Sequence, residues 1–155
     1  MKKETIIRKA TSGDLCAILQ CVEQSFEKYI DRIGKKPAPM LKDYQDFIAR
    51  DLVFVVECED CVAGFIVLID MPDHLLLDTV AVSPAFQGKS LGKKLLQFAE
   101  TLAAEKGKDE IKLCTNEKMH ENLAIYTRAG YVEYERGVEK GYNRVFFKKK
   151  LGTFS

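Results

Sequence analysis

The clearest pattern of apolar and polar positions lies between residues 75 and 104. Residues 75–82 are almost all apolar or β-branched, with Asp78 as the only charged residue, which predicts a strand buried on both faces. After a short loop with one proline, apolar residues recur at helical spacing, at Leu91, Leu95, Phe98, Ala99 and Leu102. This period predicts a long amphipathic helix that ends before Gly107.

The same two periods predict the other elements of the chain. Strands are expected over 5–9, 52–58, 61–71, 111–115, 131–137 and 142–150. Helices are expected from about 11 to 29, over 41–50 and over 117–129. Residues 31–40 hold one glycine and two prolines among polar residues, which predicts an extended loop. At 155 residues the chain is long enough to bury its own core, so we expect a single domain over residues 1–155.

Composition and charge narrow the classes of partner. The formal net charge is +1, so no strong field favours nucleic acid, and no apolar run approaches the ~20 residues of a membrane helix. Residues 1–4 lead into a strand rather than a signal sequence, so we expect a cytoplasmic protein. The five cysteines lie within apolar patterns and are expected to be reduced, with Cys58 and Cys61 facing each other across a Glu59-Asp60 turn. No metal site is expected, because this CxxC has no second pair or nearby histidine.

The loop between the central strand and helix is the main candidate for ligand binding. Its residues are Gln87, Gly88, Lys89, Ser90, Leu91, Gly92 and Lys93. A helix N-terminus carries unpaired N–H groups and a partial positive charge, so a glycine-containing turn there can bind a phosphate or pyrophosphate, and the two lysines would add charge. An ordinary turn between a strand and a helix is the alternative explanation, because a short glycine pattern is weak evidence.

The same stretch also approaches the spacing of a nucleotide-binding P-loop. Residues 83–90 fit GxxxxGK[ST], except that Ser83 replaces the leading glycine and Pro84 follows it. A P-loop needs that glycine to fold around the phosphates, and we find no convincing later strand that ends in a Mg²⁺-binding aspartate. A nucleoside triphosphatase is therefore not favoured.

Two motifs resemble those of the GNAT superfamily of N-acetyltransferases. The acetyl-CoA-binding pattern of that family is Arg or Gln, two residues, Gly, one residue, then Gly or Ala. It falls on Gln87, Ser90 and Gly92, with Ser90 in place of the first glycine. Tyr126 with Gly130-Tyr131 resembles the family's Tyr-x-x-x-Gly-Phe/Tyr segment. The order of predicted elements is also similar to the GNAT fold along nearly the whole chain.

This resemblance implies a fold and an activity. The fold would be α/β (α+β), with a mixed, mostly antiparallel central sheet of about seven strands flanked by about four helices. The activity would be transfer of an acetyl group from acetyl-CoA to a primary amine, of a small molecule or a protein, by direct attack in a ternary complex. A homodimer through the C-terminal strands is consistent with the family. The alternative is a non-catalytic acyl-CoA-binding or regulatory domain on the same fold.

The resemblance also implies roles for individual residues. Residues 87–93 would bind the pyrophosphate, and Tyr126 would protonate the leaving thiolate. Met119 stands where the family commonly has an asparagine, so Asn116 or Asn122 would have to supply that contact to pantetheine. The strand would be splayed from its neighbour, so that backbone N–H groups face the thioester oxygen and stabilise charge on it; these groups belong to Val80, Ala81 and Val82.

The residues themselves suggest a general base. A primary amine with a pKa near ~10.4 is almost fully protonated at pH 7, so a base must be reachable. Asp78 is the only acid in the buried strand, where burial would raise its pKa, and strand alternation would place it on the face of Val80 and Val82. A structural hydrogen-bonding role is the alternative. The candidates for contact with the acceptor amine, which could equally pack as a structural lid, are Tyr29, Arg32, Asp43 and Tyr44, with the hairpin over 134–142.

Overall fold

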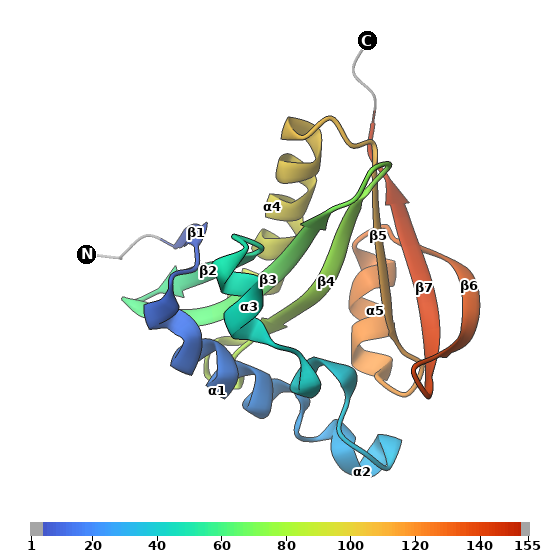
Figure 1. The fold of residues 1–155 in the computed structure, drawn as a ribbon, viewed down its shortest axis with the longest axis horizontal. Coiled ribbons are helices and arrows are strands. Elements are labelled where there is room, and N and C mark those ends of the chain that lie inside the picture. Colours follow the sequence, from blue (N-terminus) through green and yellow to red (C-terminus); the bar gives the residue numbers. More distant parts are fainter. Residues whose placement is uncertain (1–4, 153–155) are drawn as a thin grey trace.

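Within residues 5–152, which the computed structural model describes, seven strands form one central sheet (Figure 1). The strand order is β1-β2-β3-β4-β5-β7-β6, and all neighbours are antiparallel except β4 and β5. The strands are β1 (Ile6–Lys9), β2 (Val53–Cys58), β3 (Cys61–Asp70), β4 (Leu75–Val82), β5 (Glu110–Asn116), β6 (Val132–Glu139) and β7 (Tyr142–Lys150).

Helices cover both faces of this sheet (Figure 1). In the described part of the chain, the α-helices are α1 (Leu15–Phe26), α2 (Tyr29–Ile33), α3 (Tyr44–Ala49), α4 (Leu91–Glu105) and α5 (His120–Arg128), and the 3₁₀ turns are η1 (Ser12–Asp14), η2 (Ala38–Leu41) and η3 (Pro84–Phe86). Side chains of α1 and α3 share one core with Val53, Val55 and Phe65. Side chains of α4 and α5 share the other core with Val56 and Ile66. Consecutive residues of β2 and β3 thus serve different cores, which explains their unbroken apolar runs.

The strands agree with the expected fold. The β2–β3 hairpin turns at Glu59 and Asp60, and Cys58 and Cys61 lie opposite each other as free thiols, as predicted. The closing hairpin of β6 and β7 turns at residues 140–141. The mixed, mostly antiparallel sheet of about seven strands is therefore confirmed.

The segment before α3 is more helical than expected. The extended loop predicted over 31–40 contains instead the end of α2 and the start of η2. Gly34 does end α2, with a left-handed φ of 91° as its C-cap, and Pro37 precedes η2. The prediction was wrong because the glycine and the prolines interrupt a helix only at their own positions, so that the residues before them can still form one. Five α-helices therefore occur in the described chain rather than about four.

A β-bulge interrupts β4 at Asp78. Val67 of β3 pairs with Thr79, but its neighbour Leu68 pairs with Leu77. Asp78 is therefore an extra residue in β4, opposite the junction of two residues of β3. A bulge shifts the alternation of side chains, so residues after it point to the opposite face from the one that simple counting gives.

This shift changes the surroundings of Asp78. Val80 and Val82 pack against the core on the side of α4. Asp78 and Thr79 instead both contact Lys42 Nζ, at 2.7 and 3.2 Å. The expectation that Asp78 shares a face with Val80 and Val82 was therefore wrong, because it assumed an unbroken strand.

β4 and β5 separate soon after they begin. Their pairing joins Leu75 to Ile111 and Leu76 to Lys112, although β4 continues to Val82. Figure 1 shows the two strands diverging toward the end of the sheet where α2 lies. The second half of β4 therefore has β3 as a partner on one side and no strand on the other.

α4 begins with an unusual backbone conformation. Its N-cap, Ser90, has φ 62° and ψ 23°, in the left-handed region, and the serine side chain makes no capping hydrogen bond. A residue with a Cβ is strained there, whereas glycine is not. Ser90 occupies the position at which the GNAT pattern has glycine, and it adopts a conformation that favours glycine.

Every helix within residues 5–152 is too short or too polar to cross a bilayer. The expectation that residues 1–4 lead into the first strand falls on residues outside this range.

Replacement of Ser90 by glycine should stabilise the protein. The change removes the strain of a Cβ in the left-handed region, so the free energy of unfolding should rise by about 0.5–1 kcal/mol. Urea titration of the two proteins measures this difference. The matched control is Ser90→Ala, which removes the hydroxyl but keeps the Cβ and should leave stability near the wild-type value. A less stable Ser90→Gly protein would show that the hydroxyl stabilises the turn.

Candidate active site

The diverging part of β4 lies beside two adjoining hollows. The β4–α4 hollow, of about 400 Å³, lies between the end of β4, the loop that leads into α4, and α5. The β4–β7 hollow, of about 380 Å³, lies between β4, β5, β7 and the segment around η2. Four side chains line both hollows: Phe26, Val80, Asn122 and Tyr126.

Most residues predicted to bind acetyl-CoA line the β4–α4 hollow. They are Val80, Ala81, Val82, Gln87, Gly88, Ser90, Leu91, Gly92 and Asn122. Lys89 on the loop and Lys93 in the first turn of α4 are exposed and lie outside this lining. Asn116 lines the β4–β7 hollow instead, and its Oδ1 accepts a hydrogen bond of 2.9 Å from the backbone N–H of Lys118. Of the two candidate amides for the pantetheine contact, only Asn122 lies beside the loop.

The backbone of β4 presents polar groups to the space left by β5. The N–H of Ser83 donates to Ala63 O at 2.7 Å, so the backbone at Ser83 faces β3. The direction of these groups alternates along an antiparallel strand, so Ala81 also faces β3, whereas Val80 and Val82 face away from it. A ligand lying along this side of β4 can therefore pair with the N–H and C=O groups of Val80 and with the N–H of Val82, whereas the Val82 carbonyl already accepts from Ser25 Oγ at 3.3 Å and Gln87 Nε2 at 3.4 Å.

The first turn of α4 presents N–H groups to the β4–α4 hollow. The backbone N–H of Lys94 donates to Ser90 O at 3.1 Å, which is the first bond of the helix. The N–H groups of Leu91, Gly92 and Lys93 come earlier and so have no partner within the helix. Such groups, together with the positive end of the helix dipole, form a site suited to a phosphate.

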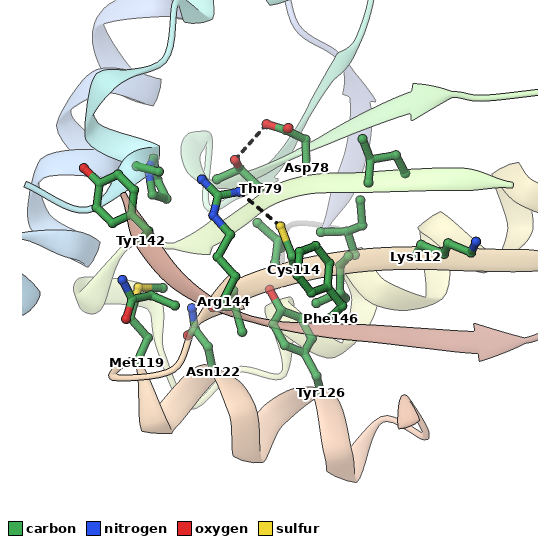
Figure 2. Close-up of a pocket in the computed structure, with 18 of the residues that line it drawn as sticks. Asp78, Thr79, Lys112, Cys114, Met119, Asn122, Tyr126, Tyr142, Arg144 and Phe146 are labelled. Atoms are coloured by element: carbon green, nitrogen blue, oxygen red, sulfur yellow. Dashed lines mark hydrogen bonds between the residues drawn. The ribbon is translucent and has the colours of Figure 1, made fainter. Parts of the chain in front are cut away.

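Tyr126 lies where the two hollows adjoin. It belongs to α5, and its ring packs edge-on against Tyr131, with 5.9 Å between the ring centroids. The residue is only 6% exposed, and this burial raises the pKa of the phenol. The Tyr126 hydroxyl is therefore protonated at neutral pH and can donate a proton or a hydrogen bond. Figure 2 shows this side chain directed from α5 toward the β4–β7 hollow.

Asp78 lies in a polar cluster with Lys42 and Thr79. Lys42 Nζ is 2.7 Å from Asp78 Oδ2, and the two side chains are only 22% and 18% exposed. Thr79 Oγ1 also donates to Asp78 Oδ2, at 3.1 Å (Figure 2). All three residues line the β4–β7 hollow. Asp78 is thus accessible from this hollow but already binds a cation.

The candidates for acceptor contact from α2 do not line the β4–β7 hollow. Tyr29 lines the β4–α4 hollow. Arg32 donates to Glu121 Oε1 of α5 at 2.7 Å, and this bond lowers the pKa of Glu121 to about 2. Arg32 therefore ties α2 to α5.

The two candidates at the start of α3 are structural as well. Asp43 is the N-cap of α3, and its carboxylate accepts a backbone N–H of the first turn. Tyr44 is buried and donates its hydroxyl to Pro39 O at 2.6 Å. From this region, the residues that line the β4–β7 hollow are instead Pro39 and Lys42, with Ala38.

Sequence reasoning missed Lys42, Thr79 and Arg144. Figure 2 shows Arg144 extending from β7 into the β4–β7 hollow, where its Nη1 lies 3.2 Å from Cys114 Sγ. The alternation of Tyr142, Arg144 and Phe146 along the last strand was an available signal, because it places the three side chains on one face. The expectation that residues 134–142 shape this pocket agrees with the lining, which includes Tyr134, Glu139 and Tyr142.

Comparisons with known proteins show the same fold. The PaiA N-acetyltransferase of Thermoplasma acidophilum, solved in complex with coenzyme A, is 20% identical with a TM-score of 0.76, over 96% of this chain and 99% of that chain. The ribosomal-protein-S18-alanine N-acetyltransferase of Escherichia coli is 16% identical with a TM-score of 0.75, over 98% and 97%. A GNAT-family acetyltransferase of Listeria monocytogenes is 22% identical with a TM-score of 0.72, over 95% of each chain.

The family match is independent of these structures. The model of the acetyltransferase (GNAT) family matches residues 18–131. This range includes β4, the loop that leads into α4, and Tyr126 on α5. The chain therefore belongs to the acetyltransferase (GNAT) family.

Proposed function

We propose that the protein transfers an acetyl group from acetyl-CoA in the β4–α4 hollow to a primary amine in the β4–β7 hollow. The observation that carries this proposal is that the two hollows adjoin at Val80, Asn122 and Tyr126. Two substrates bound at the same time could therefore react directly, so no covalent enzyme intermediate is needed.

Each part of acetyl-CoA has a suitable partner in the β4–α4 hollow. The N–H groups of Leu91, Gly92 and Lys93 would hold the pyrophosphate, with the exposed side chain of Lys89 adding positive charge nearby. The pantetheine amides would pair with β4 at Val80 and Val82, in the place that a continuous β5 would occupy.

Transfer requires one bond to form and one to break. The amine nitrogen attacks the thioester carbonyl carbon, the N–C bond forms, and the C–S bond breaks. An ammonium acceptor loses two protons in the process: one balances the proton gained by the CoA sulfur, and the other leaves to solvent. A backbone N–H group of β4 would stabilise the charge that develops on the carbonyl oxygen.

Two side chains would move these protons. Tyr126 would donate to the leaving sulfur, and its buried, protonated phenol suits that role. Asp78 would accept a proton from the amine, directly or through water, once the amine has entered the β4–β7 hollow that Asp78 lines.

A non-catalytic acyl-CoA-binding domain is the second candidate function. Two observations favour it. Met119, which stands in place of the family's asparagine, is buried, and Asp78 already forms an ion pair with Lys42. Both candidates require acetyl-CoA to bind. Only the enzyme releases CoA thiol when an amine is added.

Calorimetric titration of acetyl-CoA into the protein should give a dissociation constant in the micromolar range, whereas ATP with Mg²⁺ should not bind. Ser90→Gly should keep or strengthen the binding of acetyl-CoA, because the backbone already has the conformation that favours glycine. The absence of heat with acetyl-CoA would exclude both candidate functions.

Tyr126→Phe should lower kcat by at least about tenfold, because the leaving thiolate loses its proton donor. The affinity for acetyl-CoA should change little. Steady-state release of CoA thiol and calorimetry measure the two quantities. Tyr131→Phe is the matched control: its buried hydroxyl has no hydrogen-bond partner among the described residues, so its removal should leave kcat unchanged. Equal rates for Tyr126→Phe and wild type would remove Tyr126 as the acid.

Asp78→Asn should change the pH dependence of kcat/KM. Without the carboxylate, the rate should keep rising with pH as the free amine becomes populated, up to the amine's own pKa near ~10.4, whereas the wild-type rate should level off earlier. Lys42→Met is the control, since it breaks the same ion pair but keeps the carboxylate. If both variants gave the same altered profile, the ion pair would matter for structure, and Asp78 would not be the base.

A further inference from the structure

Residues 29–42 contribute Ala38, Pro39 and Lys42 to the lining of the β4–β7 hollow, and side-chain contacts hold this segment to α5 and to the β6–β7 hairpin. Arg32 binds Glu121 of α5, as described above, and also Lys118 O at 3.0 Å. Lys35 Nζ donates to Gly141 O at 2.9 Å and lies 4.2 Å from the centroid of the Tyr142 ring. The Tyr142 hydroxyl donates to the backbone oxygen of residue 36 at 2.6 Å. These contacts hold the segment in place beside a hollow of about 380 Å³, whose size suits a small molecule.

The charges that line this hollow favour an acceptor with an anionic group. Three cationic side chains line it, Lys42, Lys112 and Arg144, against two anionic ones, Asp78 and Glu139. Lys42 is satisfied by Asp78 at 2.7 Å. Lys112 is 30% exposed and lies 3.6 Å from a carboxylate on its own strand. A purely cationic acceptor such as a polyamine would add further positive charge to a lining that already has more cations than anions.

Arg144 is the most buried of these cations, and its ion pair is longer than that of Lys42. Its side chain is 13% exposed, and its nearest carboxylate, Glu139 Oε1, is 3.4 Å away on a side chain that is 48% exposed. Its other polar contact is Cys114 Sγ. A guanidinium carries five N–H donors in a planar fork that matches a carboxylate with two parallel bonds. Arg144 can therefore bind a carboxylate in addition to its contacts with Glu139 and Cys114.

Apart from these charges, the lining of the hollow is largely apolar. The remaining walls are rich in aromatic rings, which suits an apolar or aromatic side chain; the rings belong to Phe26, Tyr126, Tyr134, Tyr142 and Phe146.

We propose that the acceptor is a free amino acid with an apolar or aromatic side chain, whose carboxylate binds Arg144. This inference rests on the proposed function and specifies its acceptor. The amino group would lie toward Asp78 on β4 and the carboxylate toward Arg144 on β7, since both residues line this hollow and Arg144 extends into it (Figure 2). The carboxylate is the group that distinguishes this acceptor from other amines, because any primary amine could make the contact with Asp78.

The test compares amino acids with their carboxamides. Release of CoA thiol is measured with the apolar and aromatic amino acids, with the amide of each one, with spermidine and with a peptide that has a free amino terminus. The best amino acid should exceed its own amide in kcat/KM by about 10- to 100-fold, since the amide lacks the charge that Arg144 binds. Equal or faster acetylation of the amides, spermidine or the peptide would overturn the inference.

Variants of Arg144 test whether this residue causes the preference for amino acids over their amides. Arg144→Gln should reduce the ratio of kcat/KM for the amino acid to kcat/KM for its amide to near one, mainly by raising KM for the amino acid. Arg144→Lys should retain part of this preference. Arg136→Gln is the matched control, because Arg136 is an exposed arginine of β6 paired with Glu133. Its ratio should stay at the wild-type value. An unchanged ratio in Arg144→Gln, with unchanged melting temperature and acetyl-CoA affinity, would contradict the assignment.

Failure of the proposed function gives a different result. In that case acetyl-CoA binds, but no acceptor in any set releases thiol. The carboxylate site is then tested by the melting temperature of the CoA-bound protein. Amino acids should raise it and their amides should not, and Arg144→Gln should abolish the difference. No stabilisation by the amino acids would overturn the inference as well.

Discussion

The separation of β4 from β5 is the constraint on which the site depends. If their pairing continued beyond Leu76, the backbone of Val80 and Val82 would bond to β5, and the two hollows would not adjoin. The sheet remains continuous because β3 pairs with β4 along its length and β7 pairs with all of β5. Gly64 of β3 permits this contact, since a Cβ there would lie 2.5 Å from Ala81 O. The gap is therefore built into the sheet and does not depend on a mobile element.

Contacts from distant parts of the chain frame this gap. The loop into α4 lies on one side, and its first turn supplies N–H groups. Residues 29–42 cross to α5 and to the β6–β7 hairpin on the other side, through Arg32, Lys35 and Tyr142. Tyr126 stands between the two regions. The position of each functional side chain thus depends on long-range packing around two strands that do not pair.

The sequence predicted the elements better than their side-chain directions. The sequence predicted the described strands and the start of α4; burial on one or both faces leaves a direct pattern in most of these strands, although β6 is exposed along its whole length. Strand alternation misassigned the face of Asp78, because a bulge depends on the register with β3 and leaves no sign in β4 alone. Asn116, Asp43 and Tyr44 are polar or aromatic residues whose structural roles depend on backbone partners. Arg144 was missed because its surroundings come from three strands and a distant loop.

The ion pair between Lys42 and Asp78 has a consequence for how an acceptor arrives. Lys42 Nζ and Thr79 Oγ1 both contact Oδ2 of Asp78, so the ammonium group of the proposed acceptor would share the carboxylate with Lys42 by approaching Oδ1. Much of the water around Asp78 was already lost during folding, when Lys42 was bound. The acceptor would therefore cause little further desolvation of the carboxylate, but it would meet the charge of Lys42. Since Lys42 lies between η2 and α3, the position of this segment would set how strongly Asp78 attracts an amine.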